Sequence, residues 1–169
     1  MIIGKIKTLK IAWKALMSKV CVLSQGVPYP PNKGEKLRTY HQIEFLIRLG
    51  YEVEVFSLIE TAEDKKNAEA LAKHLGISVN SYQLGSKFTR YASALLQGLP
   101  ISVGAFYSKR LQHVIDEKLK EGKDALLLTA SSLSYYIFNS PYYNTTHCRL
   151  FMDFMDVDSD KWAQYADSS

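Results

Sequence analysis

The chain has 169 residues, which is the usual length of a single domain. Hydrophobic residues make up 47% of it and charged residues 22%, a balance that excludes a disordered, collagen-like or coiled-coil protein. It has no apolar run of the roughly 18 residues that a membrane-spanning helix needs. The two cysteines, Cys21 and Cys148, have no spacing typical of a disulfide framework or a metal site, which favours a reducing cytoplasm.

The formal net charge of +4 comes from one end of the chain. The first 19 residues hold five lysines and no acidic residue, whereas the rest of the chain carries 16 basic and 17 acidic side chains. A nucleic-acid-binding domain would have a basic stripe on its folded part. The sequence therefore predicts no nucleic-acid partner.

Residues 1–18 form either a basic amphipathic leader or an upstream extension. Large apolar residues recur there at steps of three and four, which places them on one face of a helix: Ile2, Ile6, Leu9, Trp13 and Leu16. A helix of this kind is able to lie on an anionic membrane, so residues 2–16 are a candidate for contact with the inner membrane. The alternative is that translation starts at Met17.

From residue 19 onward, short apolar segments alternate with amphipathic ones. Strands are predicted at 20–23, 51–58, 77–84, 125–129 and 149–153. Helices are predicted at 35–49, 63–75, 87–97, 109–121 and 133–138, with a last one after Ser159. Gly50 and Gly76 are expected to end the first two helices, and Ser108 to cap the fourth. This alternation predicts an α/β fold with a Rossmann-like, doubly wound, mostly parallel sheet.

The proline-rich loop after the first predicted strand is the first candidate site, because ligands of open α/β sheets bind beyond the carboxyl ends of the strands. Gly34 would let the backbone approach a ligand closely, and the amides that follow it favour an anion. Lys33 and Arg38 would add positive charge, and His41 lies close enough to face a ligand. The alternative is a proline-stiffened connection with a solvated end.

Two further polar segments follow predicted strands. Ser131 and Ser132 would hydrogen-bond a sugar or phosphate, or merely cap the next helix. Asp153 and Asp156 are candidate ligand contacts, and Asp156 is the best catalytic candidate. A pair such as Asp156 and Asp158 also suits a divalent metal, which leaves a metal-dependent phosphatase as a third hypothesis; Asp158 is otherwise expected to favour the start of the last helix.

Several of these segments together resemble the family 4 glycosyltransferases of the GT-B fold. They resemble in particular the sugar transferases associated with exosortase/PEP-CTERM exopolysaccharide loci. The similar segments run in order from about Val20 to Ala166, and the most specific is the aspartate-rich one: Pro28 to Arg38, Leu99 to Ser102, Phe106 to Ser108, Ser131-Ser132, Asp153 to Trp162 and Tyr165-Ala166.

The resemblance implies that residues 19–169 are the N-terminal, acceptor-side domain, which ends before the donor-binding domain. Lys33 and Gly34 would lie near the donor diphosphate or the acceptor, and Arg38, Ser131 and Asp156 would line the same cleft. Many family members have a His-Asp pair where this chain has Met155-Asp156.

The function implied is that of a hexosyltransferase in cell-surface polysaccharide synthesis. It would use a nucleotide-sugar donor, a glycan or lipid-linked acceptor, and no metal or other cofactor. The enzyme would be cytoplasmic, or peripheral at the inner membrane, and the fragment is expected to be inactive alone. The alternative is a non-catalytic Rossmann-like module that binds a glycan or a partner at the membrane surface.

Overall fold

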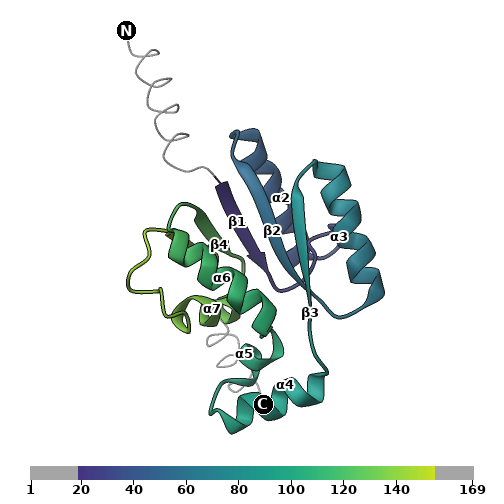
Figure 1. Cartoon of the computed structure of the whole chain (residues 1–169). Coiled ribbons are helices and arrows are strands. Elements are labelled where there is room, and N and C mark those ends of the chain that lie inside the picture. The colour runs from purple at the N-terminus through teal and green to yellow at the C-terminus, as the bar shows by residue number, and fades with distance from the viewer. Residues whose placement is uncertain (1–18, 155–169) are drawn as a thin grey trace, which may run out of the picture.

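The computed structural model describes residues 19–154, which form a five-stranded parallel sheet with helices on both faces (Figure 1). The strands are β1 (Lys19–Ser24), β2 (Glu52–Ile59), β3 (Ser78–Gln83), β4 (Ala125–Leu128) and β5 (Arg149–Met152). Their order across the sheet is β3-β2-β1-β4-β5, and every neighbouring pair is parallel. The predicted fold class is therefore confirmed.

The helices connect the strands and lie close to their predicted positions. They are α2 (Gly34–Arg48), α3 (Ala62–Leu75), α4 (Lys87–Leu96), α5 (Ile101–Ala105), α6 (Lys109–Glu121) and α7 (Ser134–Phe138), the last preceded by a 3-10 turn at Ser131–Leu133. The sequence did not predict α5. The predicted leader helix and the helix expected after Ser159 lie outside the described residues.

Alternate side chains of β1 pack against helices on opposite faces of the sheet. Val20 and Val22 point to one face, where they pack with Ile43 of α2. Cys21 and Leu23 point to the other face, into the core formed with α6 and α7. Because apolar side chains on both faces of the strand are buried, β1 is a central strand of a doubly wound sheet, with α2 and α3 on one side and α6 and α7 on the other (Figure 1).

The helix ends agree with the residues predicted to form them, except that Ser108 does not cap α6 with its side chain. Gly50 (φ 83°) and Gly76 (φ 65°) adopt left-handed backbone conformations just after α2 and α3, as expected of glycine there. Ser108 does precede α6, but its side chain makes no capping hydrogen bond. Instead its backbone N–H donates to the Tyr136 hydroxyl at 2.7 Å, and that hydroxyl donates to the Phe106 carbonyl at 2.6 Å.

Helices α4 and α5 lie beyond the carboxyl end of β3 and are joined tightly to each other (Figure 1). A Cβ atom on Gly104 of α5 would lie 2.3 Å from Cβ of Ala94 and 3.1 Å from the carbonyl oxygen of Arg90, both in α4. Only glycine allows this close approach. Across residues 19–154, no helix combines the length and apolar character needed to cross a membrane.

Candidate functional site

The order of the strands puts a crevice between the carboxyl ends of β1 and β4. The chain leaves β1 toward α2 on one face of the sheet, and it leaves β4 toward α7 on the other. The two loops therefore diverge at this point, which is where open α/β sheets bind ligands.

A small cavity of about 160 Å³ occupies this crevice. Its lining comes from both loops, from the first turns of α2 and from the segment before α6: Ser24, Gln25, Gly26, Pro28, Glu35, Lys36, Thr39, Phe106 and Thr129. Three of these residues, Ser24, Thr39 and Thr129, are buried and carry hydroxyl groups. Lys36 and Glu35 also line the cavity, so its lining includes one basic and one acidic side chain. This lining suits a polar, hydroxyl-rich ligand group.

Hydrogen bonds hold the two loops together across the crevice. The Thr129 N–H donates to the Leu23 carbonyl at 3.1 Å, and the Gln25 side-chain amide donates to the Ser132 hydroxyl. The Ser24 hydroxyl donates to the Gly26 carbonyl, which fixes the first turn of the loop after β1. Ser132 thus contributes to the shape of the crevice, while Ser131 beside it is exposed.

An ion pair joins α2 to the end of β5. The Arg38 guanidinium contacts one oxygen of the Asp153 carboxylate, and the Gln42 amide donates to the other oxygen at 2.6 Å. The Asp153 N–H donates to the Leu128 carbonyl at 2.8 Å, which anchors the carboxylate beside β4. The first helix and the start of the aspartate-rich segment therefore meet at the same end of the sheet, and Arg38 and Asp153 neutralise each other.

Of the other predicted site residues, three lie exposed in or just before α2, and one lies outside the described residues. Lys33 precedes α2 without forming a side-chain cap, and Gly34 begins the helix with open space around the position of a Cβ atom. His41 is exposed, with its Nδ1 atom 2.9 Å from a Glu44 carboxylate oxygen. Asp156 lies outside residues 19–154. None of the predicted site residues that the structure describes lines the small cavity.

The residues that do line the cavity carry weaker sequence signals. Ser24 and Thr129 end or follow apolar strands, so their position at the carboxyl ends would have indicated them. Thr39 is buried one turn inside α2, and Phe106 comes from the segment between α5 and α6. No local pattern links Phe106 to β1, because their proximity depends on how α5 packs.

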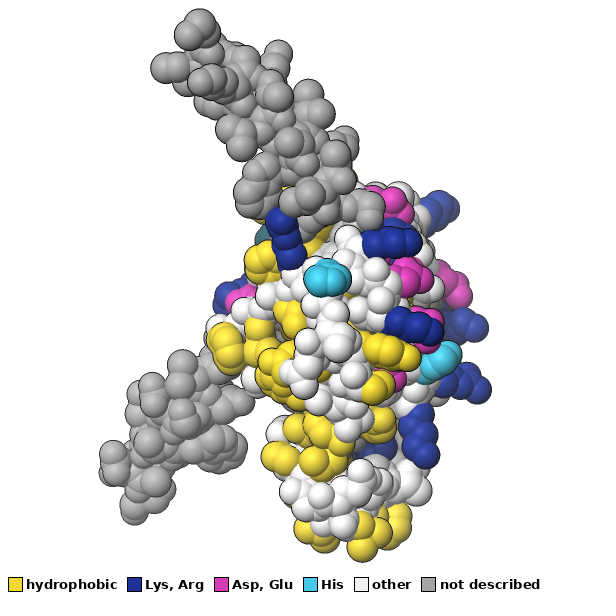
Figure 2. All heavy atoms as spheres, turned by 60° about the vertical axis from the view of Figure 1, so that its left-hand side comes forward, with side chains coloured by type: hydrophobic (Ala, Val, Ile, Leu, Met, Phe, Trp, Pro, Cys, Tyr) yellow, Lys and Arg dark blue, Asp and Glu magenta, His cyan; other side chains and the backbone are white. Residues whose placement is uncertain are grey.

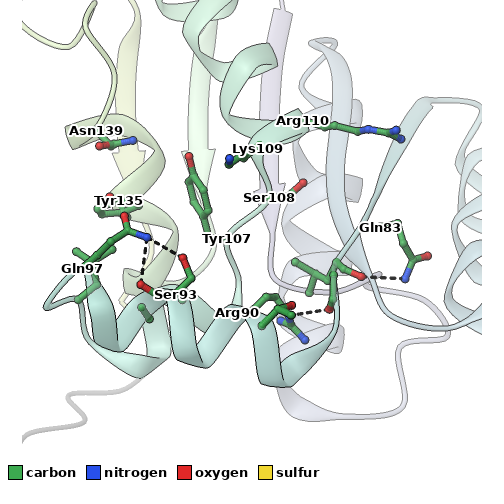
Figure 3. A pocket seen from close by; sticks show the side chains of 16 residues that line it. Gln83, Arg90, Ser93, Gln97, Tyr107, Ser108, Lys109, Arg110, Tyr135 and Asn139 are labelled. Carbon is green, nitrogen blue, oxygen red and sulfur yellow. Dashed lines mark hydrogen bonds between the residues drawn. The ribbon is translucent and has the colours of Figure 1, made fainter.

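A second, larger cavity of about 850 Å³ lies between the end of β3, α4, α5 and the starts of α6 and α7 (Figure 3). Arg90, Ser93 and Gln97 line it from α4, and Tyr107 and Tyr135 line it from the opposite side (Figure 3). Arg90 is buried, with its guanidinium 2.6 Å from a Glu60 carboxylate oxygen and its Nε donating to the Gly85 carbonyl at 3.0 Å.

A cluster of charged side chains lies at the opposite, amino end of the sheet. The Lys118 ammonium lies 3.1 Å from Asp124 and 3.3 Å from Glu54, and the Cys21 thiol is 3.7 Å from the same Asp124 oxygen. Burial raises the pKa of Cys21 to about 12, so the thiol is protonated and unreactive at neutral pH. Burial alone would lower the pKa of Lys118, but the carboxylates of Asp124 and Glu54 beside it raise it. With both pKa values raised, Cys21 and Lys118 are protonated at neutral pH, which disfavours either of them as a nucleophile.

No three His, Cys, Asp or Glu side chains within the described residues are placed to hold a metal ion together. No protein-family model matches the chain, and no curated protein matches it significantly.

Proposed function

We propose that this chain is the acceptor-side half of a two-lobed glycosyltransferase that moves a sugar from a nucleotide-sugar donor to a glycan or lipid-linked acceptor. The proposal starts from the resemblance to the family 4 enzymes. The observation that carries it further is the contact between Arg38 and Asp153. It supports a common site for the proline-rich loop and the aspartate-rich segment, which stand 115 residues apart in the sequence.

In this proposal the crevice between β1 and β4 positions the acceptor. The hydroxyl-bearing residues Ser24, Thr39 and Thr129 would hydrogen-bond a sugar, and Lys36 would stay close to a phosphate group at the mouth. Transfer of the glycosyl group breaks the bond between the anomeric carbon and the nucleoside diphosphate, forms one to the acceptor oxygen, and passes the proton of the acceptor hydroxyl to the departing diphosphate. The departing diphosphate would carry the developing negative charge toward Lys33 and the start of α2.

Binding of an acceptor mimic tests the proposal on the chain itself. A water-soluble prenyl-diphosphate-linked sugar is expected to shift the backbone NMR signals of residues 24–39 and 129–132. Lys36→Ala should weaken this binding because Lys36 lines the cavity and would contact the phosphate group at its mouth. Lys109→Ala, which removes a lysine that lines the larger cavity instead, is the matched control. Signal shifts that avoid the crevice would contradict the proposal.

A second experiment separates the enzyme from a non-catalytic binding module. The DNA that follows the codon of Ser169 is expected to encode a second Rossmann-like domain. A protein that includes this domain should transfer radiolabelled sugar, whereas the 169 residues alone should not. A stand-alone module would bind the acceptor mimic but gain no transferase activity from any downstream sequence.

A further inference from the structure

Helix α4 has two faces of opposite character. Its inward face is polar: Arg90 is buried, and Ser93 and Gln97 line the larger cavity (Figure 3). Its outward face is apolar, with exposed fractions of 82% for Phe88, 75% for Leu95 and 88% for Leu96. At about 100° per residue, these three side chains fall within one arc of the helix, on which Tyr91 also lies.

This arrangement reverses the usual orientation of a surface helix, which buries its apolar side. Leu96, Phe88 and Leu95 are the three most exposed of the large hydrophobic side chains in residues 19–154. Ile101, the first residue of the adjoining helix α5, is also 58% exposed. Figure 2 shows hydrophobic side chains gathered at the lower end of the molecule, where Figure 1 places α4. Exposed apolar surface of this extent is typical of a docking surface.

The charges around α4 favour an anionic partner. Residues 70–115, which include α4 and α5, contain no aspartate or glutamate. Lys109 and Arg110 line the cavity behind α4, and neither makes an ion pair within the described part of the chain. Glu60 pairs with both Lys87 and Arg90, so this trio retains one positive charge.

We propose that the outward face of α4 docks onto the surface of an anionic phospholipid bilayer. Phe88, Leu95 and Leu96 enter the boundary between headgroups and acyl chains, as the apolar side of an interfacial helix does. Lys87, Lys109 and Arg110 supply the long-range attraction to anionic headgroups. The proposal does not depend on sugar transfer, and it involves a surface separate from residues 2–16.

Vesicle co-sedimentation of the full chain tests the proposal. The wild type is expected to bind vesicles of phosphatidylglycerol and phosphatidylcholine, but not vesicles of phosphatidylcholine alone. The variant Phe88→Ser/Leu95→Ser/Leu96→Ser should bind about tenfold or more weakly, because burying each of these side chains contributes to binding. The three positions are highly exposed in the free protein, so the variant should keep the circular dichroism spectrum and thermal stability of the wild type.

Two further variants separate α4 from other apolar or basic segments. Phe45→Ser/Leu49→Ser removes a comparable exposed apolar pair at the end of α2 and should leave vesicle binding unchanged. Lys7→Glu/Lys10→Glu/Lys14→Glu changes the leader in the full chain. Hydrogen exchange should show that vesicles protect amides within residues 88–104 both in the wild type and in this leader variant.

Several outcomes would overturn the proposal. It fails if the wild type does not bind anionic vesicles, or if the α4 variant binds them as well as the wild type does. It also fails if vesicles protect only amides outside α4 and α5. Self-association that is lost in the α4 variant, in a chain that does not bind vesicles, would instead assign this face to a second copy of the chain.

Discussion

The two ends of the parallel sheet use charged side chains in opposite ways. At the amino end, Lys118 contacts both Glu54 and Asp124, and the side chains of all three are 9–20% exposed. At the carboxyl end, the Arg38 side chain that contacts Asp153 is 47% exposed, and two cavities open beside the loops. One end is closed by its own charges, and the other is open to a ligand.

The lengths of the connections explain this difference. At the amino end, α2, α3 and α6 return to the sheet within three residues through Gly50, Gly76 and Gly122, and only the connection over residues 139–148, before the edge strand β5, is longer. At the carboxyl end, the chain makes a loop over residues 25–33 and a longer excursion over residues 84–108, which includes α4 and α5. Loops of this kind can change without disturbing the core, which is why binding sites of α/β sheets form there.

The largest effect is expected at the closed end. Lys118→Met removes the cation that Glu54 and Asp124 share, although Glu54 keeps its ion pair with Lys19 at 3.3 Å, and should lower the free energy of unfolding by about 3 kcal/mol. Lys120→Met, at an exposed position on the same helix where the ammonium lies 5.9 Å from the centroid of the Tyr142 ring, should change it by less than about 1 kcal/mol. Urea unfolding followed by circular dichroism measures both. Equal stabilities of the two variants would show that the buried cluster contributes no more than a surface lysine.

A smaller loss is expected where α4 meets α5. Gly104→Ala forces a methyl group against Ala94 and the Arg90 carbonyl, so the two helices must separate, at a cost of about 2 kcal/mol in the free energy of unfolding. Gly34→Ala introduces the same methyl group into open space and should not destabilise the protein. Thermal and urea unfolding of the pair compare the two positions. A Gly104→Ala protein as stable as the wild type would show that the contact between α4 and α5 relaxes freely.

The sheet could be predicted because its signals are local. The apolar run of β1 and the glycines after α2 and α3 define their elements without reference to the rest of the chain. The short α5 escaped prediction because its sequence, ISVGA, contains β-branched residues and a glycine that disfavour a helix. Contact with α4 through Gly104 holds it in place, and no local pattern contains that contact.

The candidate site was predictable only in part, for the same reason. Arg38 and Asp153 stood out as polar residues near a loop and a strand end, but nothing in their spacing indicated that they contact each other. The sequence also did not indicate which face of α4 is buried. The pattern of a helix shows that one of its faces is apolar, but not whether that face packs inside the protein. The positions of Arg90 inside and Leu95 outside depend on Glu60, which lies 30 residues before Arg90.

Acid should loosen the attachment of α4 to the rest of the molecule by protonating Glu60. The hydrogen bond from Arg90, together with Lys87, holds the pKa of Glu60 below its ordinary value near 4.5. A carboxyl group with a lowered pKa stabilises the folded state above that ordinary value, and this contribution is lost as the pH falls through the lower, folded-state pKa. Glu60→Gln should therefore cost about 1 kcal/mol at pH 7 and remove part of the acid sensitivity. Hydrogen exchange of α4 amides from pH 7 down to about pH 2, below the lowered pKa, measures this, and a variant with an unchanged pH profile would contradict it.

The smallest effect on stability is expected from the ion pair at the open end. Arg38→Ala should lower the free energy of unfolding by less than about 1 kcal/mol, because Arg38 is half exposed and Gln42 still donates to Asp153. A double-mutant cycle with Asp153→Asn isolates the coupling between the two side chains. A coupling free energy as large as the loss of stability in Lys118→Met would mean that ion pairs stabilise both ends of the sheet equally. A small coupling leaves Arg38 free to exchange Asp153 for a ligand phosphate at little cost to the fold, as a residue of an open binding site must.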